Sequence, residues 1–171
     1  MNARTDAGSD QIVARFADLV KTLAAQADQI ESAQQVHDLE QAVRNGGMML
    51  LGELLGQLLQ SAVDRRQQTL RICVCGARRR HQGVRSRKVG TSLGDVRLQG
   101  IYFKCMSCGD CQHSVDAITP EAFTTIMRDM VLVAGVCSTS FDKGQVVLRQ
   151  LAGVDVDDEA VRQTCLREGH K

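Results

Sequence analysis

Cysteine is the residue type whose spacing in this sequence most clearly indicates chemistry. Five of the seven cysteines fall between positions 73 and 111, and four of these form two close pairs, Cys73 with Cys75 and Cys105 with Cys108. A glycine follows each pair, and its small size lets backbone N–H groups approach the sulfur atoms. Two such pairs can supply the four thiolates of a tetrahedral site, so the sequence predicts a structural Zn²⁺ ion held by these four residues.

The first pair has Cys-x-Cys rather than Cys-x-x-Cys spacing, which leaves the fourth ligand open. Cys111, His113 or His81 could replace Cys73 without lengthening the chain. The two cysteines nearer the C-terminus lie on predicted helical stripes, where packed thiols are the ordinary expectation. Four thiolates favour a closed structural site over a catalytic one. A redox pair at 105 and 108 lacks a thioredoxin-like context, and the cysteines alone leave an iron–sulfur cluster open.

A run of cations directly after the first cysteine pair is the second chemical feature. Residues 78–88 contain six basic side chains and no acidic one. Arginine forms bidentate contacts with phosphate, so we predict that this segment binds the backbone of double-stranded DNA and positions it rather than reading bases. A solvated surface loop is the alternative. The predicted contact residues, with two cations farther along the chain, are Arg78, Arg79, Arg80, Arg85, Arg87, Lys88, Arg97 and Lys104.

The charge distribution agrees with a polyanionic partner for the middle of the chain. The net charge is only +1 over 171 residues. Residues 1–60 carry 4 basic and 8 acidic side chains, residues 61–115 carry 11 and 3, and residues 116–171 carry 6 and 9. A cationic module between two acidic ones is typical of a protein with one nucleic-acid-binding part.

Composition excludes several other classes. The 43% apolar content argues against a disordered chain, and 3% aromatic residues with one proline argue against an all-β sandwich or barrel. No charge-free apolar stretch reaches the length of a membrane span, and no signal peptide is recognisable at the start. We therefore expect a cytoplasmic protein that associates with the nucleoid when it binds DNA.

Apolar spacing predicts the elements that position these residues. Apolar side chains recur at three- and four-residue steps over 12–30 and 32–43, which indicates two helices. The sequence Asn-Gly-Gly at 45–47 predicts a break or kink. Leucine pairs follow at four-residue steps from position 50, and they give a helix face wide enough to be packed from two sides.

Short runs rich in valine and isoleucine follow. Residues 87–93 and 96–104 predict strands joined by a two-residue connection at Gly94 and Asp95, and the hairpin ends at Cys105. Thr119, followed by proline and glutamate, predicts the next helix start, and residues 138–140 predict a further cap. Gly153 predicts a turn before a final helix that starts at 157–159.

Residues 140–168 therefore predict a helix, a short turn and a second helix. Arg162, Gln163 and Arg167 could add base readout, whereas the acidic start of the last helix also suits a cap or packing against another domain. The expected fold is α+β and mainly helical, with a small central antiparallel zinc-ribbon hairpin followed by a helix-turn-helix-like unit. Its three regions are N-terminal helical (1–70), zinc-ribbon-like and basic (71–118), and C-terminal helical (119–171).

The order of these features resembles the N-terminal region of bacterial insertion-sequence transposases of the ISKra type. The resemblance rests on residues 73–76, 91–97, 101–109 and 141–154, and its distinctive element is a basic zinc ribbon around a Thr-x-Leu-Gly-x-Val hairpin. It implies the end-binding part of the enzyme, which in that family precedes a metal-dependent nuclease domain of ribonuclease H-like fold. The three regions leave no room for that domain, so we expect a truncated or separately encoded portion that is not an enzyme.

The resemblance implies double-stranded DNA at element ends, and full-length transposase, as partners. An alternative is an interaction protein that forms a homodimer through its leucine-rich helix and regulates or inhibits full-length transposase. A third hypothesis is an enzyme, acting by thiol redox chemistry or by DNA cleavage.

Overall fold

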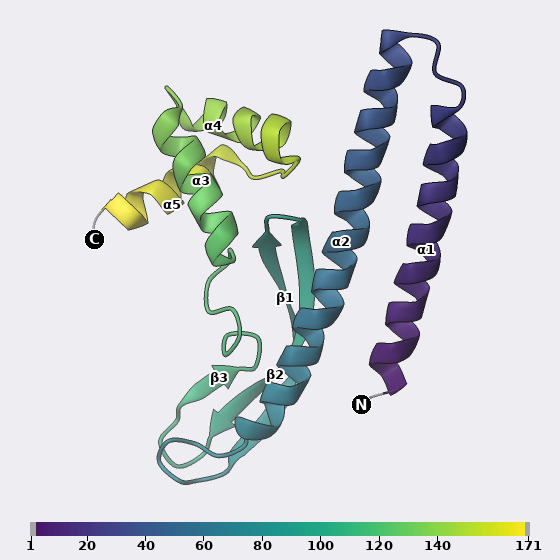
Figure 1. Ribbon diagram of the computed structural model, residues 1–171. Coiled ribbons are helices and arrows are strands. Elements are labelled where there is room, and N and C mark those ends of the chain that lie inside the picture. The colour runs from purple at the N-terminus through teal and green to yellow at the C-terminus, as the bar shows by residue number, and fades with distance from the viewer. Residues whose placement is uncertain (1–2, 170–171) are drawn as a thin grey trace.

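The longest helix, α2 (Ala33–Thr69), organises the arrangement of the other elements (Figure 1). In the computed structural model, which describes residues 3–169, α1 (Ala3–Ala27) runs antiparallel to α2. A three-stranded antiparallel sheet packs on α2 in the order β1 (Arg79–Thr91), β2 (Gly94–Cys105) and β3 (Cys111–His113). The C-terminal unit consists of α3 (Thr125–Cys137), α4 (Phe141–Val147), the π-helical turn η1 (Leu148–Ala152) and α5 (Asp158–Gly169).

The fold is therefore α+β and 57% helical, as the sequence predicts. Among the described helices, none combines the length and the apolar character that crossing a lipid bilayer requires.

Helix α2 begins where the sequence predicts but does not break where it predicts. The Oγ of Ser32 accepts a hydrogen bond from the N–H of Gln35 (3.3 Å) and caps the helix. The helix then continues through residues 45–47, so of the predicted break or kink, the break is wrong. A Cβ atom on Gly46 would lie 2.8 Å from a methyl carbon of Leu19 in α1. The glycine thus allows α1 and α2 to pack closely, which offsets its helix-propensity cost of up to ~1 kcal/mol.

Two further glycines of α2 face the β1–β2 hairpin. A Cβ atom on Gly52 would lie 2.8 Å from the carbonyl oxygen of Leu93, and one on Gly56 would lie 3.1 Å from a methyl of Val96. Helix α1 contributes an ion pair from Arg15 to Glu53 of α2. Helix α2 is therefore packed from two sides, as its wide apolar face predicts.

The hairpin turn lies two residues earlier than the sequence predicts. Strands β1 and β2 pair from Arg79 with Cys105 to Thr91 with Gly94, with one register shift between His81 and Val84. The connecting residues are therefore Ser92 and Leu93 rather than Gly94 and Asp95. The Oγ1 of Thr91 donates to the carbonyl oxygen of Gly94 (2.7 Å) and accepts from the N–H of Leu93 (3.1 Å). This threonine closes the turn, and Gly94 follows with a φ of 103°.

The hairpin shares one apolar core with α2. Val63 of α2 is buried with Val89, Leu98 and Val115, and Leu59 packs against this cluster. Strand β3 pairs only with residues 102–104 of β2. Beyond β3, the edge of β2 is hydrogen-bonded by Gln60 of α2. Its side chain accepts from the N–H of Gln99 (2.8 Å) and donates to the carbonyl oxygen of Gln99 (2.9 Å). The C-terminal half of α2 is thus fixed against the sheet by both apolar and backbone contacts.

The first helix of the C-terminal unit begins later than predicted. Helix α3 starts at Thr125, so the predicted start at Thr119 is wrong. Residues 122–124 run alongside β1 instead: the N–H of Gly90 donates to the carbonyl of Ala122 (2.8 Å), and the N–H of Thr124 donates to the carbonyl of Gly90 (2.9 Å). The ring of Phe123 occupies the space that a Gly90 side chain would fill. These tertiary contacts outweigh the local helix-start signal.

The remaining predictions of helix caps and turns in the C-terminal region agree with the structure. Ser140 caps α4 by accepting from the N–H of Lys143 (3.3 Å), Gly153 has a φ of 68°, and Asp157 accepts from the N–H of Ala160 (2.6 Å) at the start of α5. The helices enclose a second core that includes Met127, Val131, Leu148 and Val161. The order helix, turn, helix is present, whereas the helix-turn-helix assignment stays a prediction.

Two glycine substitutions in α2 should have opposite effects on stability. We expect Gly52→Ala to destabilise the protein by about 1–3 kcal/mol, because the new methyl would contact the backbone carbonyl of Leu93. Gly47→Ala has no atom within 4 Å of the new methyl and should stabilise α2 by about 0.5–1 kcal/mol. Urea unfolding followed by circular dichroism measures both, and stabilisation by Gly52→Ala would contradict the packing described.

Candidate metal centre and basic surface

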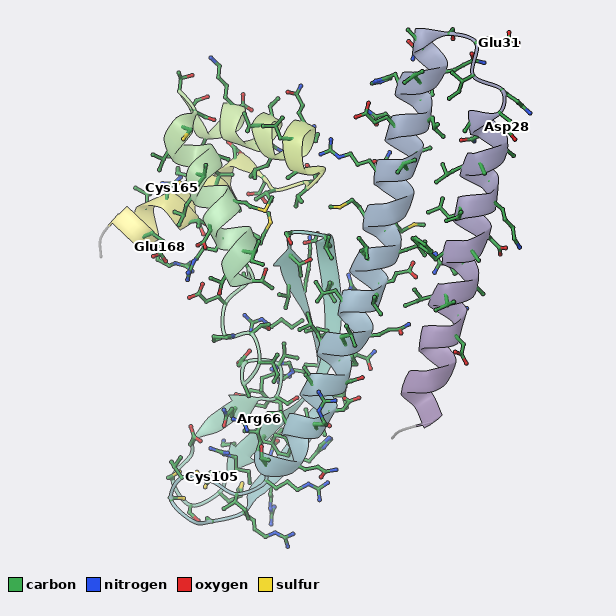
Figure 2. The ribbon with its side chains drawn as sticks, in the orientation of Figure 1. Asp28, Glu31, Arg66, Cys105, Cys165 and Glu168 are labelled. Atoms are coloured by element: carbon green, nitrogen blue, oxygen red, sulfur yellow. The ribbon has the colours of Figure 1, made fainter. Side chains whose placement is uncertain are left out.

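Two tight turns present the four cysteines at the end of the sheet remote from the C-terminal unit (Figure 2). In the loop after α2, the N–H of Gly76 donates to the carbonyl of Cys73 (2.9 Å), and Gly76 has a φ of 83°. After β2, the N–H of Gly109 donates to the carbonyl of Cys105 (3.1 Å), and Gly109 has a φ of 77°. Each glycine takes a left-handed conformation that other residues rarely adopt, which explains why one follows each cysteine pair.

The structure brings all four predicted cysteines together. The Sγ atoms of Cys73, Cys75, Cys105 and Cys108 lie within 4.8 Å of one another. Cys73 and Cys108 are 3.5 Å apart at sulfur, and so are Cys75 and Cys105. These separations are too long for a disulfide bond of about 2.05 Å. They are close to the ~3.8 Å edge of a tetrahedron with Zn–S bonds of about 2.3 Å. The four cysteines could therefore hold a metal ion such as Zn²⁺.

The thiols influence one another's ionisation. Backbone N–H groups of Cys108 and Ser107 point at the sulfur of Cys105 and lower its pKa to about 6. The N–H of Asp110 favours the thiolate of Cys108, but the neighbouring thiols of Cys105, Cys73 and Cys75 raise its pKa to about 12. Four sulfurs in contact cannot all ionise without a compensating cation. A bound divalent ion would supply that charge and release the remaining thiol protons.

Arg79 supports this cluster from inside the protein. Its side chain is only 5% exposed and donates to the carbonyls of Leu70 (3.0 Å) and Ile72 (3.1 Å) and to Oδ2 of Asp110 (2.6 Å). The same carboxylate oxygen lies 3.7 Å from the sulfur of Cys73. The hydrogen bond between Arg79 and Asp110 raises the pKa of Arg79 and lowers the pKa of Asp110. Arg79 thus fixes the cysteine loop, and the prediction that it contacts DNA does not fit this position.

The alternative fourth ligands lie outside the cysteine cluster. Cys111 is exposed, and its thiol donates to the carbonyl of Gly109 (3.4 Å). Nδ1 of His113 faces Asp116 at 3.9 Å, and the ring of His81 lies edge-on to Phe103. Cys73 occupies the fourth position instead.

The other two cysteines have different environments. Cys165 packs against the C-terminal core, where burial raises its pKa, and its thiol fills the space beside Gly135. Figure 2 shows it far from Cys105. Cys137 is exposed at the last position of α3, so the prediction of a packed thiol is wrong there.

The remaining predicted DNA contacts fall into three groups. Arg87 is an internal residue, because it pairs with Asp116 and donates to the carbonyls of Thr119 and Pro120 (both 3.0 Å). Lys88 pairs with Asp95 (2.6 Å), and the guanidinium of Arg85 lies 4.6 Å from the ring centre of Tyr102. The third group is exposed and makes no ion pair with an acid of the described chain. It consists of Arg78, Arg80, Arg97 and Lys104.

Strand geometry places these exposed cations on both faces of the hairpin. Arg80 pairs across the ladder with Lys104, and Lys88 pairs with Arg97. Arg97 and Lys104 are seven positions apart on one strand, and alternate side chains point to opposite faces. The predicted cationic surface is therefore a ribbon with positive charge on both sides, not a single loop.

Sequence reasoning missed the cations at the C-terminal end of α2. Arg65 and Arg66 lie in its last turns, and Arg71 lies in the following loop. Arg71 lines a groove of about 570 Å³ between α2 and the sheet, together with Arg78, His81 and Asp64. The count of 11 basic residues over 61–115 includes all three missed arginines. That count is the signal from which they could have been found.

Comparison with known proteins gives no family assignment: no protein-family model matches the sequence, and no curated protein matches it significantly.

Among the cysteines, only the four in the cluster should be required for metal binding. We expect one Zn²⁺ per chain in the purified protein and its loss in Cys105→Ser and Cys108→Ser, because three thiolates hold zinc less tightly than four. Cys111→Ser, whose thiol lies outside the cluster, is the matched control and should retain the ion. Elemental analysis after gel filtration measures the metal content, and equal zinc in Cys108→Ser and the wild type would contradict the assignment.

Arg79 and Arg80 are adjacent but should affect metal binding differently. Arg79→Met removes the buried partner of Asp110 and should weaken Zn²⁺ affinity about 10- to 100-fold. Arg80→Met removes an exposed side chain and should leave the affinity unchanged. Competition with a chromophoric chelator gives both values, and the same affinity for the two variants would exclude the supporting role of Arg79.

Proposed function

We propose that this protein is a zinc-stabilised module that binds double-stranded DNA. On the family resemblance, we further propose that it serves an insertion-sequence transposase by binding element ends. The observation that carries the proposal is the position of the cysteine cluster, which joins the end of α2 to the end of β2 beside exposed and unpaired cations. Zn²⁺ is the ion that best suits a closed set of four thiolates.

The exposed cations need an anionic partner. Arg80 lies directly opposite Lys104, and Arg71 and Arg78 line the same groove. Like charges at such positions repel one another and destabilise the isolated protein. Phosphate groups would relieve that repulsion and accept bidentate hydrogen bonds from each guanidinium.

The shape of the ribbon also suits duplex DNA. The major groove admits a two-stranded β-ribbon. Cations on the face of such a ribbon that meets the DNA can reach the phosphates that border the groove. The segments on both sides of the cationic region carry more acidic than basic residues, which would direct DNA toward the hairpin and away from α1 and α5.

We propose a structural rather than a catalytic role for the metal. Four thiolate ligands would leave no coordination position for water or a phosphodiester oxygen. The chain's own residues would then bind and orient DNA, and any strand transfer would require another polypeptide.

DNA binding should be salt-dependent and should depend on the cross-strand pair. For ~4–6 neutralised phosphates, log Kd against log salt concentration should have a slope of about 4–5 in magnitude. Arg80→Ala/Lys104→Ala should weaken binding at least ~10-fold and reduce the slope by about 2. Fluorescence anisotropy with a labelled duplex of random sequence measures both.

The matched control is Lys21→Ala/Lys143→Ala, which removes two exposed lysines far from the hairpin. It should leave affinity and slope unchanged. A wild-type affinity that does not vary with salt, or equal effects of the two double variants, would contradict DNA binding by the hairpin. Selection from random duplexes then tests the element-end proposal, which requires enrichment of a defined sequence.

A further inference from the structure

An apolar surface covers one side of the α1–α2 pair and has no partner within the described chain. On α1, Val13, Phe16 and Val20 follow the spacing of one helix face and are 67%, 51% and 50% exposed. On α2, exposed apolar residues recur at steps of seven or eight positions, which also keeps them on one face. They are Val36, Val43, Leu51 and Leu58. We refer to these seven residues as the outer apolar face.

The two stripes lie on the same side of the helical pair. On α1, the residues that meet α2 include Arg15 and Leu19. The stripe lies about a quarter turn from them around the helix axis, in the direction in which the chain winds from the N- to the C-terminus. On α2, the residues that meet α1 include Gly46 and Glu53, and the stripe again lies about a quarter turn beyond. Because the helices are antiparallel, equal rotations in the same sense bring both stripes to one side.

This side is directed away from the sheet. Gly52 and Val63 of α2 contact the hairpin, and they lie nearly opposite the stripe of Leu51 and Leu58 around the helix axis. The outer apolar face is therefore not the surface that holds the hairpin, and it is independent of the metal centre and the cations.

Charge and area indicate what covers this face. Residues 1–60 carry 8 acidic and 4 basic side chains, which disfavours nucleic acid or an anionic bilayer as the occupant. The stripe on α2 runs from Val36 to Leu58 and is thus about 34 Å long, and two helices side by side are about 20 Å wide. This side of the helical pair therefore has an area of roughly 700 Å², near the ~800 Å² per partner of a stable protein interface.

We propose that a second copy of this chain covers the outer apolar face. A layer of two antiparallel helices with one unpaired apolar side is half of a four-helix bundle. A two-fold axis through this face would bury the same residues on both copies and close the assembly at a dimer. The two hairpins would then lie on opposite outer sides of the bundle, each with its own metal centre.

The mass of the full-length, zinc-loaded protein in solution tests the proposal. Sedimentation equilibrium at 1–100 µM should give twice the chain mass of 18.7 kDa. Phe16→Glu/Val20→Glu on α1 and Val43→Glu/Leu51→Glu on α2 should each give the single-chain mass with unchanged helical circular dichroism. The control Val136→Glu/Leu151→Glu alters residues that are 76% and 78% exposed on the C-terminal unit, and it should remain a dimer.

A wild-type monomer at 100 µM, a dimer that persists in both outer-face variants, or an assembly larger than two copies would overturn the proposal. If the variants fail to fold, the thermal unfolding midpoint of the wild type at several protein concentrations tests for the dimer instead. The midpoint of a dimer rises with protein concentration, whereas that of a monomer does not. Because no DNA is present in these measurements, a failure here is distinguishable from a failure of DNA binding.

Discussion

Four sulfur atoms from two turns, one before β1 and one after β2, share a single small volume at the open end of the hairpin. The conformation of that end of the molecule depends on how their charge is balanced. Apolar burial does not hold this region. Ile72, Val74 and Met106, the apolar residues beside the cysteines, are 54%, 94% and 59% exposed. A bound metal ion would supply the stability that the missing apolar core does not, since structural zinc contributes roughly 10–16 kcal/mol in small peptide systems. On this account the ion, rather than hydrophobic packing, fixes the loop after α2 to the end of β2.

The ion pair between the buried Arg79 and the exposed Asp110, and the exposed cations, follow from this arrangement. The side chain of Arg79 is buried, where it donates hydrogen bonds to backbone carbonyls of the cysteine loop and to the carboxylate of Asp110 beside Cys73. Its neighbour Arg80 points to the other face of the strand and pairs with nothing acidic in the described residues. One contiguous basic segment therefore supplies both a buried arginine that supports the cysteine loop and exposed cations, and strand alternation decides which arginine is buried.

The sequence correctly predicted features that depend on short residue patterns. The caps at Ser32 and Ser140 depend on a few neighbouring residues, so spacing was sufficient. The convergence of the cysteines joins residues up to 35 positions apart, and it was predictable because each pair has a spacing typical of metal ligands. Other features that depend on distant residues carry no such signal. From the sequence alone Gly46 indicates a helix break, whereas in the structure Leu19 of α1 packs on it. From the sequence alone Arg87 indicates a phosphate contact, whereas the fold pairs it with Asp116, which is 29 positions away.

X-ray absorption at the zinc edge of the purified full-length protein tests the central claim most directly. We expect four sulfur scatterers at about 2.3 Å and no nitrogen or oxygen in the first coordination shell. A shell that contains nitrogen or oxygen, or a fully folded protein that takes up no zinc, would contradict it.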